Sequence, residues 1–457
     1  MRLAGKLSSV HGHIVKAGIW LKVRCDRMAE RVNMEVNVKE FFYDMIKDPG
    51  CFAVNREAPH ADHLFCRNVE EAVKETSSFR FSLNGLWKFH YAKNYRSTIP
   101  GFEKTAYNCE GWDDIPVPAH IQMEGYDAPQ YANTQYPWDG REEIVPGEVP
   151  EHFNPVASYV KYFEVPEHFD RERVYISFQG AESGMALWLN GQFVGYSEDS
   201  FTPAEFFLSP WLAEGKNKLA VQVFKWTSGS WCEDQDFFRF SGLFREVYLY
   251  TTPKIHVRDL KVETDLSGGE QREVPDGEFS ESDPGVETAM SGLSAGYQNG
   301  TLQVTVWAAA GSECAESGGE KGAGQISLSL YGSWKGFGEE RLEDALCLSV
   351  KKDFLAAGEN RYTLEVREPK LWSAEEPNLY QLLMQVYDEK MVLQEVILQD
   401  VGFRKFELKD SIMYLNGKRI VFKGVNRHEF CCESGRVVSD ADTLTDILTM
   451  KRHNINA

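Results

Sequence analysis

Hydrophobic and polar residues alternate along the chain from about residue 75, which predicts a series of short β-strands. A period of two places successive side chains on opposite faces of a strand, one towards a core and one towards solvent. Asn190 and Gly191 separate two apolar runs, and this dipeptide favours a two-residue hairpin turn. Frequent turn signals and few helical stretches predict an antiparallel β-sandwich over residues 75–252. The clearest alternation occurs at 86–91, 158–165, 174–178 and 187–196.

A second group of strands, over residues 253–402, predicts a small immunoglobulin-like sandwich. It begins with the alternating segment 255–262. An acidic, Gly/Ser-rich stretch at about 264–295 and a Gly-rich stretch at 311–324 are expected to be solvated loops. The later strands are expected at 325–331 and 380–387.

The pattern changes after residue 403. Asn416 and Gly417 predict another hairpin, and its second arm is expected to continue as a largely apolar strand over about 419–425. The chain is therefore expected to leave the sandwich architecture in this segment.

A helix is expected to follow from about Ser439. Serine is a favourable N-cap, and Asp440 and Asp442 would lie at the positive end of the helix dipole. A strand followed by a helix predicts that residues 403–457 are the first βα unit of a TIM barrel, truncated because a barrel needs eight such units. The expected buried stripe of the helix consists of Leu444, Ile447 and Leu448.

The first 74 residues are expected to form an N-terminal extension and arm. Residues 1–33 lack clear periodicity, whereas Met34 opens a more regular segment. One hypothesis is that Met34 is the native start and that residues 1–33 are not part of the native protein. Mass spectrometry of the N-terminus would test it, because peptides from before Met34 would contradict it.

Composition and charge exclude several function classes. The 457 residues carry 49 basic and 69 acidic side chains, a formal charge of −20. Without a dense basic patch, a nucleic-acid partner is not expected. No apolar run of about 18 residues or more indicates a membrane span, and no convincing signal peptide precedes the first strands. Nine scattered cysteines without a regular spacing are typical of reduced thiols, so a cytoplasmic location is expected.

Three segments could carry chemistry. In the first, Glu233, Asp234 and Asp236 stand beside aromatic residues, and clustered carboxylates suit sugar hydroxyls or a cation. Carboxylates this close in sequence rarely face each other across a substrate. A polar loop that pairs with Arg239 and Arg245 is the alternative interpretation.

The second segment contains His428, at the end of the expected apolar strand. Catalytic and binding residues of a TIM barrel lie at the C-terminal ends of its strands, so His428 occupies a suitable place. A metal site is a weak alternative, because Cys432 stands where a His-Glu-x-x-His motif would have its second histidine. A hydrogen-bonded structural histidine is the other alternative. The third segment, 125–137, is a Pro- and aromatic-rich polar loop that could reach a neighbouring domain or could simply be a loop.

Taken together, these segments resemble the β-galactosidases of glycoside hydrolase family 2, of the large bacterial type. The resemblance runs along nearly the whole chain from about residue 50. The motif at 369–380 marks the wider family, which includes β-glucuronidases, whereas Tyr-Asp-Ala-Pro at 126–129 and Glu-Asp-Gln-Asp at 233–236 point to the β-galactosidase branch. The other matching motifs lie at 54–57, 82–89, 117–129, 241–245, 401–404 and 423–429.

The resemblance implies a mainly β architecture: a jelly-roll β-sandwich, an Ig-like β-sandwich and the truncated first βα unit of a TIM barrel. It assigns Asn133 and Asp236 to a galactose pocket, with Asp236 also near a sodium ion. It assigns His428 to hydrogen bonding around the sugar in the transition state. It further implies sodium and magnesium as cofactors of the full-length enzyme, a galactoside substrate and a homo-oligomer.

The chain departs from the family pattern at the catalytic groups. Family members use two glutamates on later barrel strands, one of them in an Asn-Glu segment, and this dipeptide is absent from the chain. Because double displacement needs both carboxylates, the chain alone is expected to be inactive, with no catalytic residue of its own. The magnesium ligands and a further sodium ligand of the family are also expected beyond Ala457.

Three hypotheses remain open at this point: an enzyme fragment, a noncatalytic carbohydrate-binding β-sandwich protein, and a chain that complements a separately encoded C-terminal piece. A β-glucuronidase-like relative is the alternative within the family. The fragment hypothesis predicts an exposed apolar patch, because part of the βα unit would lack its barrel partners. The expected patch consists of Ile420, Val421, Phe422, Leu444, Ile447 and Leu448.

Overall fold

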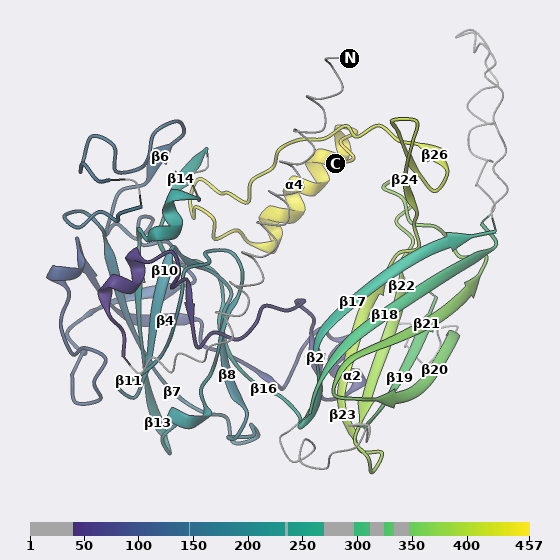
Figure 1. Ribbon diagram of the computed structural model, residues 1–457, viewed down its shortest axis with the longest axis horizontal. Helices are drawn as coiled ribbons and strands as arrows, with labels where there is room; N and C mark the ends of the chain where they lie inside the picture. Colours follow the sequence, from purple (N-terminus) through teal and green to yellow (C-terminus); the bar gives the residue numbers. More distant parts are fainter. Residues whose placement is uncertain (1–39, 146, 234–235, 269–296, 311–323, 333–346) are drawn as a thin grey trace, which may run out of the picture. The chain divides into compact units, whose positions relative to one another are not determined.

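A computed structural model describes residues 40–145, 147–233, 236–268, 297–310, 324–332 and 347–457 (Figure 1). The contacts divide the chain into two units, Met1–Phe42 and Tyr43–Ala457. The fold described below is that of the second unit. Residues 1–33 and Met34 lie outside the described residues.

Two antiparallel sheets form the first β-sandwich, as the alternating pattern predicts. Two short strand pairs extend it, β6 (Gln130–Ala132) with β14 (Phe237–Arg239), and β9 (Ala181–Glu182) with β15 (Gly242–Leu243). The seven-stranded sheet has the order β1 (Ala53–Val54), β11 (Gln192–Ser197), β10 (Gly184–Leu189), β13 (Lys216–Phe224), β7 (Val156–Glu164), β4 (Gly85–Ala92) and β5 (Asp113–Val117). The four-stranded sheet has the order β12 (Ala204–Phe207), β8 (Val174–Phe178), β16 (Val247–Thr251) and β3 (Arg80–Ser82).

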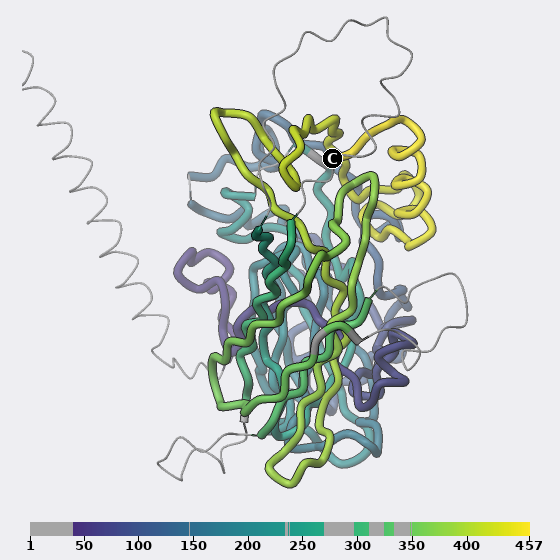
Figure 2. The backbone as a smooth tube through the Cα atoms, turned by 90° about the vertical axis from the view of Figure 1, so that its right-hand side faces the viewer, coloured from purple at the N-terminus to yellow at the C-terminus, as the bar shows by residue number. Residues whose placement is uncertain are grey.

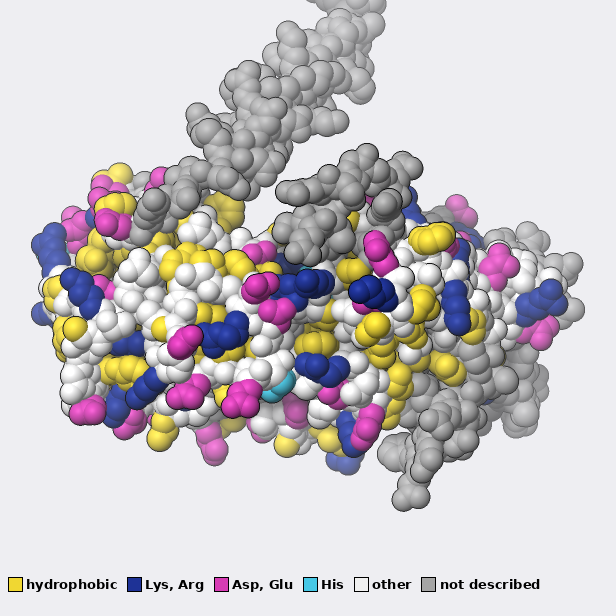
Figure 3. Space-filling view, turned by 90° about the horizontal axis from the view of Figure 1, so that it is seen from below, with side chains coloured by type: hydrophobic (Ala, Val, Ile, Leu, Met, Phe, Trp, Pro, Cys, Tyr) yellow, Lys and Arg dark blue, Asp and Glu magenta, His cyan; other side chains and the backbone are white. Residues whose placement is uncertain are grey.

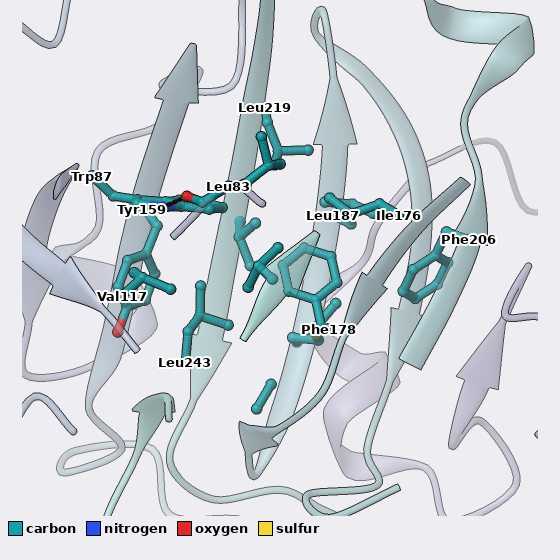
Figure 4. Close-up of a cluster of buried hydrophobic side chains, with 14 of the residues drawn as sticks. Leu83, Trp87, Val117, Tyr159, Ile176, Phe178, Leu187, Phe206, Leu219 and Leu243 are labelled. Atoms are coloured by element: carbon teal, nitrogen blue, oxygen red, sulfur yellow. Dashed lines mark hydrogen bonds between the residues drawn. The ribbon is translucent and has the colours of Figure 1, made fainter. Parts of the chain in front are cut away.

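The core of this sandwich is formed by the inward-facing positions of both sheets (Figure 4). Trp87 on β4 is 1% exposed, and its indole nitrogen donates to the carbonyl oxygen of Leu83 at 2.8 Å. Its ring meets that of Tyr159 on β7 edge to face, with the centroids 6.4 Å apart. Phe178 and Phe206 of the four-stranded sheet pack into the same cluster. The predicted alternation therefore gives a closed apolar layer between the sheets.

The hairpin predicted at Asn190 and Gly191 is confirmed between β10 and β11. Both residues have positive φ, 52° and 83°, as a type I′ turn requires. This turn matches the right-handed twist of the two strands that it joins, which is why the local sequence was sufficient to predict it.

The second sandwich also consists of two antiparallel sheets. The predicted loop at 264–295 is wrong at its start, because β17 continues through Ser267 by pairing with β18. The remainder of that loop, and residues 311–323 of the other, lie outside the described residues. One sheet has the order β17 (Ile255–Ser267), β18 (Asn299–Ala310) and β21 (Gly358–Arg367). The other has the order β2 (Phe65–Cys66), β23 (Leu393–Val401), β22 (Tyr380–Tyr387), β19 (Gly324–Tyr331) and β20 (Cys347–Leu355).

Residues 43–74 contribute strands to both sandwiches, which the sequence pattern did not predict. β1 pairs with β11 at the edge of the first sandwich, and β2 pairs with β23 at the edge of the second. The short helices of the described residues lie in this segment and in the loops of the first sandwich. They are α2 (Val69–Val73) and the 3-10 helices η1 (Tyr43–Lys47), η2 (Tyr95–Ser97), η3 (Ser209–Trp211) and η4 (Ser228–Trp231).

After the second sandwich, a three-stranded hairpin sheet leads to the C-terminal helix (Figure 2). Asn416 and Gly417 form the predicted turn between β25 and β26, with φ of 53° and 77°. The strand predicted at 419–425 is wrong, because β26 ends at Arg419. Within the described residues, no neighbouring strand forms a ladder of backbone hydrogen bonds with residues 420–425. The backbone bonds of this segment include Asn456 N–H to Lys423 O and Val425 N–H to Ala457 O, both 3.0 Å. The three strands are β24 (Phe406–Lys409), β25 (Ile412–Leu415) and β26 (Lys418–Arg419).

The predicted C-terminal helix is confirmed as α4 (Asp440–Arg452). Ser439 is its N-cap, and Ser439 and Asp442 form a reciprocal capping box. The expectation that its apolar stripe is buried is wrong: Leu444, Ile447 and Leu448 are 57%, 44% and 42% exposed. They lie on the surface together with the exposed Val421 and Phe422, as the fragment hypothesis expects, whereas Ile420 of the expected patch is partly buried.

The described surface mixes both charge signs. On the face drawn in Figure 3, Lys and Arg side chains alternate with Asp and Glu among apolar groups. None of the described helices is long and apolar enough to cross a membrane.

Candidate functional site

The strand pair β6–β14 brings two of the predicted site residues together. Tyr131 on β6 lies opposite Phe238 on β14. The Tyr131 hydroxyl donates to the Asp236 carboxylate, and the Asn133 side chain is a second hydrogen-bond partner of the same phenol. The bond to Asp236 stabilises the protonated phenol and raises the pKa of Tyr131 above its usual range. Residues separated by about a hundred positions therefore form one polar group.

This polar group faces solvent. Tyr131 is 55% exposed, and Asn133 and Asp236 are also exposed. A carboxylate, an amide and a phenol can accept and donate hydrogen bonds to several hydroxyl groups at once. Exposed aromatic rings beside them, Tyr131 and Phe238, offer apolar faces of the kind that pack on a sugar ring.

The acidic loop before β14 is partly held by an arginine. Arg239 donates to the backbone oxygen of Glu233 at 2.6 Å, so this arginine binds the main chain of the loop. Arg245 instead lies 3.6 Å from Glu429, in the segment that carries His428. Burial raises the pKa of Glu233 to about 7, and the nearby carboxylate of Glu182 contributes to the increase. Asp234 lies outside the described residues.

His428 is exposed and lies in a stretch without helix or strand, so it does not follow a formed strand as predicted. Its segment nevertheless contacts β14. The Phe430 ring stacks on that of Phe238, with centroids 5.4 Å apart and planes within 10° of parallel (residues 420–436 run towards β14 in Figure 1). Arg427 pairs with Asp446 of α4 at 2.9 Å. The structure thus brings the segment of His428 to the strand pair that carries Asn133 and Asp236.

The loop at 125–137 is more than a connection, because buried and aromatic contacts fix both of its ends. Asp127 pairs with Lys225 at 2.5 Å, and both side chains are almost fully buried. At the other end, Tyr136 stacks on Trp138 with centroids 5.3 Å apart and meets Trp231 at 4.6 Å. β6 lies between these anchors, which explains how a polar loop can present Tyr131 and Asn133 in a defined position.

The candidate metal ligand Asp236 offers oxygen donors only. Carboxylate, amide and phenol oxygens suit a hard cation such as sodium, and Asp236 has one carboxylate oxygen free of the Tyr131 bond. Among the described residues, no group of three or more His, Cys, Asp or Glu side chains could hold a metal ion. The oxygen donors around Asp236 are therefore of the type that suits a hard cation.

Sequence analysis missed the aromatic part of this site. Neither Phe238 nor Phe430 was among the expected site residues, yet their rings join two segments almost two hundred residues apart. The three aromatic residues at 237, 238 and 240 favour a β-strand and were a signal that could have revealed this short element.

A first β-sandwich with a polar site at its edge, a second β-sandwich, and a hairpin sheet followed by a helix form the domain order expected of multidomain glycoside hydrolases. Three models of one family match consecutive parts of the chain. The sugar-binding domain of glycosyl hydrolases family 2 matches residues 80–253, a second domain of the family matches 255–404, and its TIM barrel domain matches 406–457. The chain belongs to glycosyl hydrolase family 2, and the predicted fold class is confirmed.

Relatives in the same family have names that specify the substrate. A β-galactosidase of Halalkalibacterium halodurans is 47% identical over 415 residues, which cover 90% of this chain and 36% of that protein. A β-galactosidase of Streptococcus thermophilus is 42% identical and covers 92% of this chain and 36% of that protein. A β-galactosidase large subunit of Latilactobacillus sakei is 36% identical, with coverage of 90% and 60%. The chain thus spans about a third of the length of the first two relatives.

Solved structures share the fold at lower identity. A Bacteroides uniformis β-glucuronidase superimposes with a TM-score of 0.59 at 19% identity, covering 82% of this chain and 38% of that one. A Bifidobacterium dentium β-glucuronidase, solved with coumarin-3-O-glucuronide, gives a TM-score of 0.59 at 17% identity, with coverage of 82% and 56%. At this level of identity, the structural similarity shows the fold and does not identify the substrate.

Proposed function

We propose that this chain is the N-terminal part of a retaining β-galactosidase that hydrolyses terminal β-D-galactosides. In this proposal Asn133, Asp236 and His428 bind the galactosyl group. The relatives named β-galactosidase, at 36–47% identity, favour a galactoside over the glucuronide of the more distant structural neighbours. The catalytic carboxylates would come from outside this chain, so the chain by itself would bind sugar without cleaving it.

One observation carries the proposal: the polar group on β6 and β14 meets the segment of His428 at a single surface. Asp236 and Asn133 share Tyr131 as a hydrogen-bond partner, and Phe430 stacks on Phe238 beside them. Polar side chains of the first sandwich that bind hydroxyl groups, and the histidine of the C-terminal segment, can then contact one sugar. Such contacts discriminate between sugars, because a substrate that lacks the matching hydroxyl leaves the site's polar groups unpaired.

Three further expectations belong to the same proposal. A sodium ion would bind with Asp236 as a ligand, and the full-length enzyme would also use magnesium. The full-length form would be a homo-oligomer. A cytoplasmic location is supported by the scattered cysteines, six of which are free thiols among the described residues.

Galactose binding by the purified 457-residue chain tests the sugar site. We expect titration calorimetry to show weak binding of D-galactose and weaker binding of D-glucuronate. Asp236→Asn is expected to lower the affinity about tenfold, because it removes the charge that binds hydroxyl groups and sodium. Asp114→Asn, an exposed carboxylate on β5 of the same sandwich, is the matched control. Equal affinities for both sugars, or an unaffected Asp236→Asn variant, would contradict the proposal.

A separate experiment tests whether sodium binds at Asp236. Replacing sodium chloride by choline chloride at constant ionic strength is expected to weaken galactose binding by the wild-type chain and to leave Asp236→Asn unchanged. An identical loss in both proteins would indicate a general salt effect and would argue against Asp236 as the ligand.

Hydrolysis of a nitrophenyl β-galactoside separates the enzyme from a noncatalytic binding protein. The chain alone is expected to show no turnover, whereas co-expression with a C-terminal family 2 fragment is expected to restore it. Turnover by the chain alone would refute the assignment of both glutamates to other segments. Sugar binding that no C-terminal fragment converts into turnover would favour the noncatalytic binding protein.

A further inference from the structure

Arg436 joins the segment of His428 to the first sandwich through two hydrogen bonds. Its guanidinium donates to the Glu182 carboxylate on β9 at 2.5 Å and to the backbone oxygen of Phe238 on β14 at 2.5 Å. We call these two bonds the Arg436 contact. The side chains of Arg436 and Glu182 are only 10% and 6% exposed, so the ion pair is shielded from solvent.

Aromatic rings surround the Arg436 contact. The guanidinium lies 5.4 Å from the ring centroid of Phe201 and 5.6 Å from that of Phe240. Such positions add a cation–π attraction and restrict where the guanidinium can go. Two hydrogen-bond acceptors and two aromatic rings together favour one orientation of the planar guanidinium. An ion pair on the exposed surface, with flexible side chains, would have no such fixed orientation.

The backbone around Arg436 is shaped to reach this placement. Cys431 and Gly435 exchange two backbone hydrogen bonds, at 2.7 and 2.8 Å, and close a tight turn between His428 and Arg436. Gly435 has φ of 66°, and a β-carbon added there would lie 2.9 Å from the His120 ring. The turn therefore packs directly on the sandwich, and the position favours glycine.

Phe238 receives two of the contacts between the segment and the first sandwich. Phe430 stacks on its ring, and Arg436 binds its backbone oxygen. The same residue pairs with Tyr131, the hydrogen-bond partner of Asp236. The segment and the Asp236 group are thus in contact with the same residue.

We infer that Arg436 is a positioning residue: through Glu182 and Phe238 it sets the position of His428 relative to Asn133 and Asp236. The inference rests on the proposed function, because these three residues are taken to bind one sugar. Arg436 is not expected to touch the sugar, and its effect on binding would come from the geometry of the residues that do.

Removing the arginine should release the segment. We expect hydrogen–deuterium exchange of the full 457-residue chain to show faster exchange at 429–436 and at β14 in Arg436→Gln, by about tenfold or more. Galactose affinity should fall by about tenfold, the scale on which displaced supporting groups weaken a site. Arg436→Lys keeps the charge but cannot form the planar fork, so an intermediate loss is expected.

Two further variants separate positioning from general damage. Arg436→Gln removes the hydrogen-bonded cation of the buried Glu182, although Arg239 and Lys225 remain near it, and this loss can destabilise the whole sandwich. The double variant with Glu182→Gln removes both charges; it should keep the wild-type unfolding midpoint and still show fast exchange at 429–436 with weak galactose binding. Arg96→Gln is the matched control, since it removes an arginine that pairs with Glu151 at 2.7 Å on the exposed surface.

The outcomes distinguish the two proposals. If the wild-type chain binds galactose and the double variant matches it in exchange and affinity, the inference is overturned. If the wild-type chain binds no galactose, the proposed function fails and Arg436 has no role in sugar binding. In that case faster exchange in the variants would still show that the Arg436 contact holds the segment. Fast exchange with unchanged galactose affinity would reduce Arg436 to a structural residue.

Discussion

Glu395 on β23 should make the stability of the second sandwich fall as the pH rises. Its side chain is 1% exposed, and its carboxylate accepts the Val257 amide at 2.8 Å. Burial raises the pKa of Glu395 from 4.5 to about 8, and the bond from Val257 offsets only part of this effect. The buried carboxyl is therefore protonated at neutral pH, and it lies beside a cavity that is also lined by His63 and His256.

The direction of this pH dependence follows from the linkage between proton binding and folding. The pKa of Glu395 is higher in the folded chain than in the unfolded chain, so the folded state binds the proton more tightly. The corresponding stability is complete below pH 4.5 and is lost as the pH rises towards 8. A difference between 4.5 and about 8 corresponds to at most roughly 5 kcal/mol. We expect a measured loss of about 2–5 kcal/mol, because local water entry reduces the cost of a buried charge.

Glu395→Gln removes this titration and keeps an oxygen to accept the Val257 amide. Urea unfolding at pH 5.0, 6.5 and 8.5, followed by fluorescence, would measure the free energy of unfolding of both proteins. The variant should gain stability relative to the wild type as the pH rises. His63 and His256 titrate with the opposite sign, since burial lowers the pKa of both, and their effect cancels in this difference.

The control is Glu365→Gln, an exposed glutamate on β21 of the same sandwich. It should show the same pH dependence as the wild type. If Glu395→Gln also followed the wild type across this pH range, the reasoning from burial would be refuted.

Three further variants test the packing and the local geometry. Trp87→Ala should cost about 3–5 kcal/mol in the free energy of unfolding, because it leaves a cavity in the first core, and a loss below about 1 kcal/mol in urea titrations would argue against that core. Ser439→Ala should cost about 1 kcal/mol of local stability by removing the N-cap, seen as faster amide exchange in the first turn of α4; unchanged exchange would contradict the capping box. Gly435→Ala should disturb the turn at His120 and speed exchange at 429–436, whereas a variant with native exchange would show that the turn tolerates a β-carbon.

Strands with their own alternation and turn chemistry were predictable from the sequence. The segments 174–178 and 380–387 have the predicted bounds, since each is a mostly apolar run whose side chains are largely buried. The helix after Ser439 was also predictable, because the N-cap Ser439 and its capping partner Asp442 are only three residues apart in the sequence. In these cases the information is local.

Elements that depend on distant partners were not predictable. Residues 420–425 are apolar enough for a strand, but a strand also needs neighbours that accept and donate its backbone bonds. β1 and β2 are two residues long and exist only because β11 and β23 offer open edges. Single-sequence patterns carry no information on such pairing across the fold.

The candidate site likewise combines residues that could be named from the sequence with a spatial arrangement that could not be predicted from it. The family resemblance assigned residues 133, 236 and 428 to a sugar site, but nothing in the local sequence placed them together. Their association depends on Phe238, whose ring and carbonyl oxygen receive Phe430 and Arg436. A substitution at Phe238 should therefore affect sugar binding more than its own exposed position suggests, since it carries the geometry of both halves of the site. Because polar side chains bind a sugar selectively only when they are held in place, in the proposed site the rings and the buried ion pair would contribute to specificity as much as the groups that contact the hydroxyls.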